Sequence, residues 1–313
     1  MTQKHLSLLA GGVGGAKFAY GVMRALPDPA SLTVIVNVGD DFEHFGLKIC
    51  PDLDTVCYTL AGLENPATGW GRRGESWRVM EAVAVLGGPD WFRLGDLDLA
   101  THLERTRRLR AGQPLHEIAA AFCKTWGVKA RVLPVTNESV PTVVLTDEGE
   151  LAFQEYFVRK RWQPRVRGFR FVGAENARPA PGVLESLRTA DAVLIAPSNP
   201  FVSIDPILAI PGVRDALAGK PVLAVSPIIG GKAVKGPAAK MFRELGYEPS
   251  AAAVAEHYRG LVSHFVLDEA DADQAAAVRE IVPHVLVTDT LMTDATKRVE
   301  LARTVLSWLE REP

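Results

Sequence analysis

Long apolar runs are absent from this sequence, and cysteine is scarce. No stretch approaches the roughly 20 apolar residues that a membrane-spanning helix requires, so we expect no membrane anchor. The chain passes directly into an apolar run at Leu6, without the pattern of a signal peptide. The three cysteines form no C-x-x-C pair, which argues against a disulfide framework and favours buried thiols; they are Cys50, Cys57 and Cys123. We therefore expect a cytoplasmic protein with reduced cysteines.

An excess of charge of either sign is also absent, with 35 Lys and Arg against 37 Asp and Glu. This balance gives no global basic field for nucleic acid. Of two local basic runs, the one at 105–110 holds no aromatic residue for stacking bases, and we interpret it as an exposed face. The run at 159–167 includes Trp162, so a ring or phosphate site and a solvated loop both stay open. The 313 residues, 47% of them hydrophobic, predict one large globular unit.

A glycine-rich segment, Gly11 to Lys17, follows the first predicted strand at Leu6 to Ala10. Apolar residues then recur at helical spacing from Phe18 to Leu26, and a second apolar run, Leu32 to Val36, predicts the next strand. Strand, glycine loop, helix and strand form the opening unit of a parallel α/β sheet. The backbone N–H groups of such a loop suit a phosphate group, because the helix dipole also favours an anion there.

This glycine loop departs from both common phosphate-binding motifs. Against the P-loop, Ala16 stands at the last glycine and Phe18 at the Ser or Thr that binds magnesium. Against the dinucleotide fingerprint, Lys17 stands where a third small residue packs. Two interpretations therefore remain for this segment: a phosphate site, and a tight strand-to-helix turn that binds no ligand.

Four aspartates cluster after the second predicted strand; they are Asp40, Asp41, Asp52 and Asp54. Carboxylates this close repel one another, so a divalent cation or a basic ligand is their natural partner. A purely structural use is open for Asp52 and Asp54, which precede a helix predicted at 55–61 and would complement its dipole. Asp40 and Asp41 instead follow the carboxyl end of a parallel strand, where ligand sites lie in such sheets.

The middle of the chain predicts helices and a hairpin. A glycine-rich turn carries Arg72, which is either solvated or part of a clamp for a phosphate or carboxylate. Helical patterns follow at 76–86 and 96–126. Three short alternating segments, at 131–135, 140–146 and 151–157, predict strands, and the last two predict an antiparallel hairpin.

The parallel pattern resumes in the last third of the chain and predicts a sheet of five or six strands in all. Two apolar runs, 190–196 and 221–225, end in polar or glycine-rich turns at Pro197 to Pro200 and at Ser226 to Pro237. Such turns meet at one crevice of a parallel sheet. Lys232 and Lys235 flank a predicted helix start at Ala238, which indicates a second anion site.

Taken together, these motifs closely resemble the 2-phospho-L-lactate transferase family of coenzyme F-420 biosynthesis. The matching stretches, in the order of the family, are 11–17, 37–41, 51–55, 69–72, 197–200, 226–232 and 235–237. The resemblance implies an α/β, Rossmann-like fold with a mostly parallel sheet flanked by helices and a smaller α+β insertion. We expect the core at about 1–65 and 185–313, and a helical and hairpin insertion at about 66–184.

The resemblance also implies a reaction and its partners. In this family, the terminal ribityl hydroxyl of the deazaflavin Fo attacks the phosphorus that bears a three-carbon acid in a guanosine diphosphate-linked donor, and GMP leaves. Mg²⁺ is the implied cofactor, and we expect a homodimer. The three-carbon acid is lactyl, phosphoenolpyruvyl or phosphoglyceryl; an alanine- and arginine-rich composition, typical of a high-GC bacterium, favours the phosphoenolpyruvyl donor. A nucleotide-binding relative outside deazaflavin metabolism and a non-catalytic nucleotide-binding module are the alternatives.

The same resemblance suggests roles for individual residues. Asp41 and Asp54 are expected to bind Mg²⁺, with Asp40 and Asp52 orienting them or accepting the proton of the attacking hydroxyl. The expected nucleotide and pyrophosphate residues are Gly12, Gly14, Gly15, Lys17, Asn37, Ser198, Asn199, Gly230, Gly231, Lys232 and Lys235. Thr55 and Arg72 are expected to contact substrate.

Overall fold

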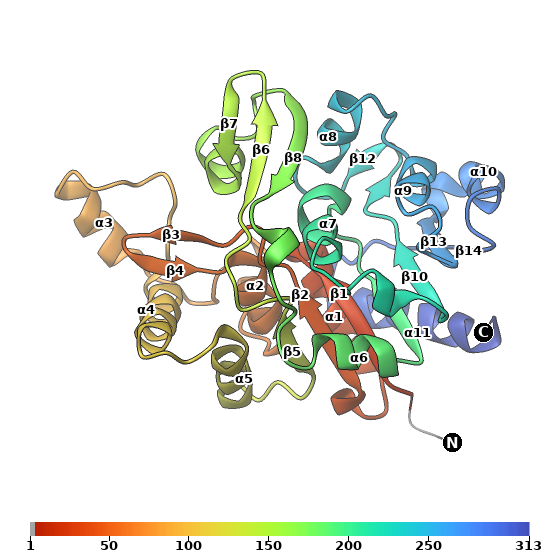
Figure 1. Ribbon diagram of the computed structural model, residues 1–313, viewed down its shortest axis with the longest axis horizontal. Coiled ribbons are helices and arrows are strands. Elements are labelled where there is room, and N and C mark those ends of the chain that lie inside the picture. The colour runs from red at the N-terminus through yellow and green to blue at the C-terminus, as the bar shows by residue number, and fades with distance from the viewer. Residues whose placement is uncertain (1–3, 313) are drawn as a thin grey trace.

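Strand β1 (Leu6–Ala10) lies at the centre of the main sheet and is buried along its whole length (Figure 1). It pairs in parallel with β2 (Leu32–Val36) on one side and with β9 (Ala192–Ile195) on the other. In this computed structural model, which describes residues 4–312, the main sheet has the strand order β14-β13-β10-β9-β1-β2-β5. The other strands are β5 (Arg131–Pro134), β10 (Val222–Val225), β13 (His264–Asp268) and β14 (His284–Thr288). The sheet thus has seven strands where five or six were expected, and β5 forms its edge beside β2.

The order of the strands reverses at β1. Later strands add outward through β2 and β5 on one side, and through β9, β10, β13 and β14 on the other. Such a reversal leaves a crevice at the carboxyl ends of the two central strands, β1 and β9. Both strands are buried on two faces, which explains their continuous apolar sequences. The predicted Rossmann-like α/β class is confirmed.

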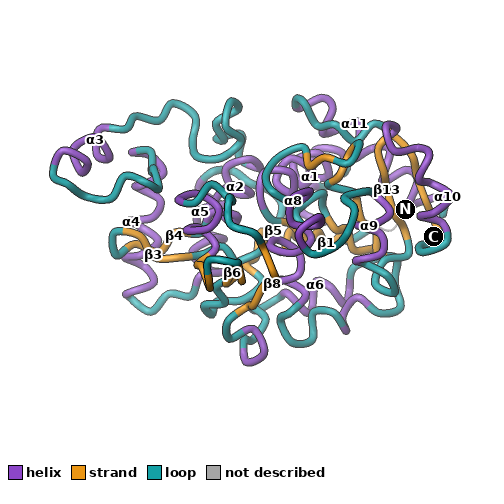
Figure 2. The backbone as a smooth tube through the Cα atoms, turned by 90° about the horizontal axis from the view of Figure 1, so that it is seen from above, coloured by secondary structure: helices purple, strands orange, loops and turns teal. Residues whose placement is uncertain are grey.

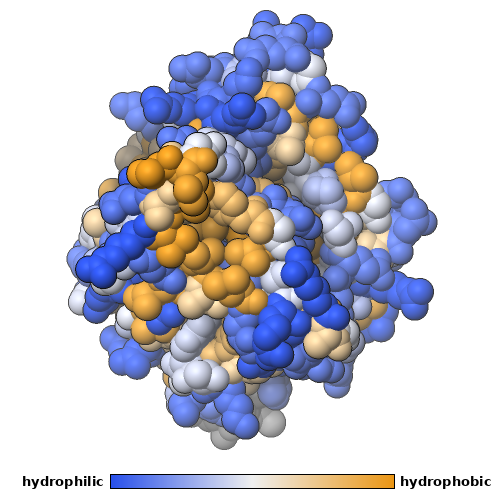
Figure 3. All heavy atoms as spheres, turned by 90° about the vertical axis from the view of Figure 1, so that its left-hand side faces the viewer, coloured by the Kyte–Doolittle hydropathy of each residue, from blue (hydrophilic) through white to orange (hydrophobic). Residues whose placement is uncertain are grey.

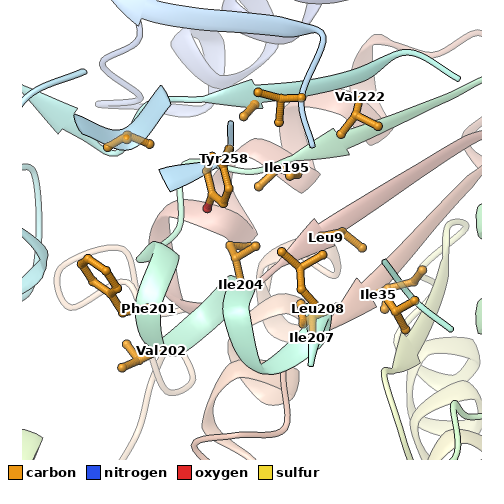
Figure 4. Close-up of a cluster of buried hydrophobic side chains, with 14 of the residues drawn as sticks. Leu9, Ile35, Ile195, Phe201, Val202, Ile204, Ile207, Leu208, Val222 and Tyr258 are labelled. Carbon is orange, nitrogen blue, oxygen red and sulfur yellow. The ribbon is translucent and has the colours of Figure 1, made fainter. Parts of the chain in front are cut away.

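Helices cover both faces of the main sheet, with α1 and α11 on one side of β1 and α6 on the other (Figure 2). The first face packs against α1 (Gly12–Ala25), α2 (Pro51–Leu60), α5 (Leu115–Thr125) and α11 (Ala295–Arg311). The second packs against α6 (Val183–Thr189), α7 (Asp205–Leu208), α8 (Ala238–Glu244), α9 (Ala251–His257) and α10 (Ala275–Arg279). Figure 4 shows the second face, where Leu9, Ile35 and Ile195 of three strands lie near Ile204, Ile207 and Leu208. Cys50, Cys57 and Cys123 are buried and free, as predicted.

Three small antiparallel sheets accompany the main one. They are β3 (Phe42–His44) with β4 (Leu47–Ile49), β6 (Thr142–Thr146) between β7 (Gly149–Ala152) and β8 (Val166–Phe171), and β11 (Ile228–Ile229) with β12 (Lys232–Ala233). The predicted hairpin is confirmed as β6 and β7, but β7 ends at Ala152 and a π-helix, η2 (Glu155–Arg159), follows it. A second π-helix is η4 (Pro200–Ile204), and short 3-10 turns lie at Pro29–Ser31, Ala174–Asn176, Asp215–Leu217 and Glu269–Gln274. The division into core and insertion at 66–184 stays a prediction, and β5, within that range, belongs to the main sheet.

The helical pattern at 96–126 forms two helices, α4 (Asp96–Arg110) and α5, rather than one. Gly112, in a left-handed conformation with φ +86°, and Pro114 separate them, because neither residue continues a helix. Helix α3 (Arg78–Val85) precedes α4 and extends from one end of the molecule (Figure 1). Figure 3 faces this end and shows apolar side chains gathered on it; the exposed large apolar residues of α3, α4 and the residue after α3 are Val79, Val85, Leu86, Leu97 and Leu103. Among residues 4–312, no helix has the length and apolar character to cross a membrane.

Gly21 sets the close crossing of α1 and α11. A Cβ atom at this position would lie 2.1 Å from the carbonyl oxygen of Arg298 and 2.7 Å from its carbonyl carbon. Gly21→Ala is therefore expected to lower the free energy of unfolding by about 2 kcal/mol, because two backbones would have to separate. Urea denaturation measures this, with Arg24→Ala, an exposed change on the same helix, expected to stay within about 0.5 kcal/mol of wild type. Equal stability of Gly21→Ala and wild type would contradict the crossing.

Candidate active site

A cavity of about 640 Å³ opens at the carboxyl ends of β1 and β9. Its walls come from the starts of α1 and α2, the turn after β9 and the segments that follow β10 and β14. Many of the residues singled out in the sequence line it: Gly12, Gly14, Lys17, Asp40, Asp52, Asp54, Thr55, Ser198, Asn199 and Lys235. The structure therefore places the glycine-rich segment, the acidic segment and one of the two predicted lysines around a single space.

The glycine-rich segment forms the first turns of α1 rather than a loop. The helix starts at Gly12, so the predicted start at Phe18 was too late. The N–H of Gly11 donates to Ser198 Oγ at 3.2 Å, and the N–H of Gly12 donates to Asp52 Oδ1 at 2.6 Å. The N–H groups of Val13 and Gly14 in the same turn have no acceptor within the helix. Together with the helix dipole, they favour an anion in the cavity.

Two of the glycines are also needed for packing. A Cβ atom at Gly14 would lie 2.4 Å from the carbonyl oxygen of Pro197, and one at Gly15 would lie 2.6 Å from Ser198 Oγ. Gly14 lines the cavity, and Gly15 is not among its lining residues. The glycine-rich segment therefore also has a structural role: it packs the start of α1 tightly against the turn after β9.

Asp52 is fixed by donors on both of its oxygens. Besides the Gly12 N–H on Oδ1, Asn37 Nδ2 donates to Oδ2 at 2.9 Å, and Asn37 Nδ2 also contacts the Val202 carbonyl at 3.1 Å. Asn37 is buried and is not among the lining residues, so the structure places it behind Asp52 as a positioning residue. Burial raises the pKa of Asp52 to about 6, although the hydrogen bonds from Asn37 and Gly12 oppose this rise.

Asp40 lies beside Asp52, and their side chains share a hydrogen bond. Burial raises the pKa of Asp40 well above its usual value, and the Asp52 and Asp41 carboxylates raise it further. Asp40 therefore holds a proton more readily than a free aspartate does. The other oxygen, Asp40 Oδ1, is buried without a hydrogen-bond partner. Two neighbouring buried carboxyl groups whose pKa values are both raised fit a divalent cation, whose charge would favour their ionised forms.

The pKa of Asp52 predicts a pH dependence of stability. Between its ordinary value of 3.8 and the folded value of about 6, the folded state keeps a proton that the unfolded state has lost. The stabilisation that Asp52 contributes is complete below the pKa of the unfolded state and is lost as the pH rises through the pKa of the folded state. The loss amounts to about 3 kcal/mol.

Urea unfolding of wild type and Asp52→Asn between pH 4 and 7, with a chelator present, measures this loss of stability, because the range spans the folded pKa of about 6. The variant is expected to gain stability relative to wild type as the pH rises. A difference that does not change with pH would contradict the raised pKa.

Asp41 and Asp54, the predicted metal ligands, each have a cationic side chain as partner. Lys48 Nζ lies 3.0 Å from Asp41 Oδ2, and Asp41 is not among the lining residues. Asp54 lines the cavity and is paired with the guanidinium of Arg105. Arg105 is buried, so the prediction that the basic run at 105–110 is an exposed face is wrong for this residue. These ion pairs reduce the need for a metal at either carboxylate, and the assignment of Mg²⁺ to them stays a prediction.

Asp98 and His102 of α4 join Asp54 on the same wall of the cavity. The three groups offer ligand atoms within 4.8 Å of one another, which by distance alone would suit a metal. Arg105 also donates to His102 Nδ1 at 3.2 Å, and Tyr58 donates to Asp98 Oδ1 at 2.8 Å. Because a guanidinium already supplies the positive charge, this network fits a second cation less well than Asp40 and Asp52 do.

Two lysines line the cavity, and among residues 4–312 each of them donates only to a backbone carbonyl. Lys17 Nζ donates to the Met292 carbonyl at 3.1 Å, and Lys235 Nζ donates to the Thr68 carbonyl. Burial lowers the pKa of Lys17, and Arg298 lowers it further; burial and then Lys17 lower the pKa of Lys235. Lys17 is half-buried and Lys235 is exposed at the edge of the cavity. Two ammonium groups that repel each other form a site for an anion.

Other predicted residues lie away from the cavity lining. Gly230, Gly231 and Lys232 belong to the β11–β12 hairpin, where the Gly230 N–H donates to Asp271 Oδ2 at 3.0 Å and Lys232 is exposed. The Arg72 guanidinium lies over the rings of Tyr58 and Trp126, 5.6 and 5.7 Å from their centroids. The predicted nucleotide contacts of the hairpin residues and the predicted substrate contact of Arg72 stay predictions that this geometry does not support.

An apolar wall, which the sequence reading did not single out, completes the cavity. Phe92 and Leu94 follow α3, and Phe153 and Phe157 flank the start of η2 with stacked rings 5.5 Å apart. Gln154, between these two, donates to the Asp40 carbonyl at 3.2 Å and so ties this wall to the acidic pair. A cavity with one apolar wall, two ammonium groups and paired carboxylates suits a ligand that carries both a ring system and phosphate groups.

Comparison with known proteins gives relatives of the same length. The phosphoenolpyruvate transferase of Streptomyces coelicolor is 47% identical over 311 residues, which cover 97% of each chain. That of Thermobifida fusca is 50% identical over 287 residues, covering 88% of this chain and 89% of its own, and that of Mycolicibacterium smegmatis is 44% identical over 318 residues, covering 95% and 97%.

A structural comparison supports the fold. The crystal structure of a UPF0052 family protein from Bacillus halodurans superposes with a TM-score of 0.60 at 16% identity, covering 98% of this chain and 99% of that one. The family model described as 2-phospho-L-lactate transferase CofD matches residues 7–304. This chain therefore belongs to the 2-phospho-L-lactate transferase CofD family, as its motifs predicted.

Proposed function

We propose that this protein transfers a phospholactate-type group from a guanosine diphosphate-linked donor to the terminal ribityl hydroxyl of the deazaflavin Fo, in coenzyme F-420 biosynthesis. One observation carries the proposal: a single cavity holds an acidic pair beside the start of α1, two lysines that donate to backbone carbonyls and an apolar wall. Transfer of this kind needs groups that neutralise charge, binding sites for two phosphates and an apolar surface for the ring of the acceptor. Family membership gives the reaction type.

In the proposed reaction, the hydroxyl oxygen of Fo bonds to the phosphorus that bears the three-carbon acid. The bond from that phosphorus to the bridging oxygen breaks, and GMP leaves with this oxygen. Asp52 or Asp40 accepts the hydroxyl proton; a cation bound beside them would keep both carboxyl groups ionised and so able to accept it. Lys17 and the free N–H groups of the first turn of α1 hold the phosphate oxygens.

We propose that Mg²⁺ is held by Asp40 and Asp52, which line the cavity, in preference to Asp41, which is paired with Lys48 outside the lining. When bound there, the ion would neutralise charge that develops on the transferred group. Asp54 lies on the neighbouring wall of the cavity, where its ion pair with Arg105 holds it in place.

For the donor we propose phosphoenolpyruvyl guanosine diphosphate, because the similar proteins of Streptomyces, Thermobifida and Mycolicibacterium carry the name phosphoenolpyruvate transferase. The predicted homodimer also stays a proposal. The apolar side chains of α3 and α4 at one end of the molecule are the surface that a second copy would cover (Figure 3).

Mass spectrometry of the products tests the function. The protein is incubated with Fo, Mg²⁺ and each of the three donors in turn: lactyl, phosphoenolpyruvyl and phosphoglyceryl. We expect a phosphodiester of Fo and release of GMP, fastest with the phosphoenolpyruvyl donor, and at least about 100-fold slower formation of both with Asp52→Asn. Binding of GDP without product from any donor would instead support the non-catalytic alternative, and turnover of a nucleotide without Fo would place the protein outside deazaflavin metabolism.

A further inference from the structure

Trp70 is a large aromatic residue that is left exposed at the edge of the cavity. Its side chain is 43% exposed, and it lines the cavity together with Val234 and Leu291, which are 65% and 42% exposed. These three residues lie on different segments of the chain, yet they border one opening. Exposed apolar surface that gathers at the opening of a cavity indicates a binding surface rather than packing.

The segment that carries Trp70 is held in one conformation by its own hydrogen bonds. The N–H of Gly69 donates to the Asn65 carbonyl at 2.8 Å, and the N–H of Asn65 donates to the Gly71 carbonyl at 3.1 Å. Thr68 Oγ1 donates to the Trp70 carbonyl at 2.6 Å. The indole therefore stands on a preorganised turn, which lowers the entropy that is lost when a ligand stacks on it.

Two contacts place this turn directly beside the anion site that Lys17 and Lys235 form. A Cβ atom at Gly69 would lie 2.7 Å from Val13 Cγ1 in the first turn of α1, so the turn packs closely against the Val13 side chain there. Lys235 Nζ donates to the Thr68 carbonyl, and the ammonium group of Lys17 is close enough to lower the pKa of Lys235 by repulsion. A ligand that places phosphate on these lysines and a ring on Trp70 is a nucleotide.

We propose that Trp70 stacks on the base of the nucleotide part of the donor, while Lys235 and Lys17 hold its phosphates. This inference rests on the proposed function in that the donor is taken as a guanosine diphosphate derivative. The ring of the acceptor then lies against the other apolar wall, which Phe92 and the stacked pair Phe153 and Phe157 form. An indole face stacks on any base, so Trp70 contributes affinity for the nucleotide and leaves the choice of base to other groups.

Calorimetric titration with GMP and with ribose 5-phosphate tests the proposal without any turnover. Wild type is compared with Trp70→Leu, Trp70→Phe and a matched control, Trp162→Leu, whose indole is 39% exposed but does not line the cavity. We expect Trp70→Leu to weaken GMP binding about 10-fold or more, because base stacking on an aromatic side chain has this strength. Ribose 5-phosphate should bind all variants alike, Trp70→Phe should keep most of the affinity for GMP, and Trp162→Leu should match wild type.

Other outcomes would overturn the stacking role. An equal loss for GMP and ribose 5-phosphate would show that Trp70 only maintains the turn, and a change of less than about twofold for GMP would show that no base lies on it. In steady-state kinetics, Trp70→Leu should raise the KM for the donor and leave the KM for Fo unchanged; the reverse would assign the indole to the acceptor ring. A protein that binds GMP through Trp70 but forms no product would refute the proposed function and keep this inference.

Discussion

Asp52→Asn is expected to lower kcat by about 10² to 10⁴-fold at saturating donor, Fo and Mg²⁺. Both oxygens of Asp52 accept hydrogen bonds, from Gly12 and Asn37, so an amide at this position would turn an N–H₂ group toward one of these donors. The change also removes the negative charge that is needed to hold a cation or to accept the hydroxyl proton. Initial rates of GMP release measure kcat.

Asp41→Asn is the matched control for this prediction. Asp41 belongs to the same acidic cluster, but Lys48 neutralises it and it is not among the lining residues. We expect its kcat to stay within about tenfold of wild type. Equal losses in the two variants would favour the assignment of Mg²⁺ to Asp41 that the family resemblance suggests. Asp54→Asn does not discriminate, because it leaves the Arg105 guanidinium buried without a carboxylate and would destabilise the fold by about 3–5 kcal/mol.

Lys17→Met should raise the KM for the donor by about 10- to 100-fold, which corresponds to one lost charge-assisted hydrogen bond to phosphate. The methionine keeps the length and apolar stem of the side chain, so packing between α1 and the Met292 segment is preserved. The KM for Fo should not change, because the acceptor is uncharged at its ribityl hydroxyl. Steady-state kinetics with each substrate varied in turn measure the two constants.

Lys232→Met is the control for the lysine prediction. The sequence placed Lys232 in the same anion site as Lys235, whereas the structure places it on the exposed β11–β12 hairpin, outside the lining. Its kinetic constants are therefore expected to match those of wild type. A loss equal to that of Lys17→Met would mean that the hairpin folds over the donor during the reaction.

The fold could be predicted from the sequence where burial on both faces leaves a continuous apolar run, as at Leu6 to Ala10 and Leu32 to Val36. The carboxyl-end position of Asp40, and hence the place of the site, followed from the same reasoning. The start of α1 could not be predicted in this way, because helical glycines are read as a loop when no contact shows why they are needed. Here the contacts of Gly14 and Gly15 with the turn after β9 require them.

Arg105 shows a different limit of sequence reasoning. A run of basic residues is usually solvated, and only packing of α4 against α2 directs this guanidinium inward to Asp54. A signal was nonetheless present: Asp98, His102 and Arg105 recur at i, i+4 and i+7, which places them on one face of a helix. A polar stripe of this kind, facing an acidic segment elsewhere in the chain, marks a buried network that net charge does not reveal.

The strand order at the switch point also has a consequence for folding. The hydrogen bond from Gly11 to Ser198 that closes the cavity joins residues 187 positions apart, and β1 pairs with β9 only after the intervening segment has been synthesised. Closing so long a loop is slow, since its entropy must be lost before the contact forms. Until β9 has been synthesised, one edge of β1 lacks its partner strand, and such an unpaired apolar edge favours aggregation of incompletely folded chains. Affinity for nucleotide should therefore appear in refolding only with the last, slowest phase.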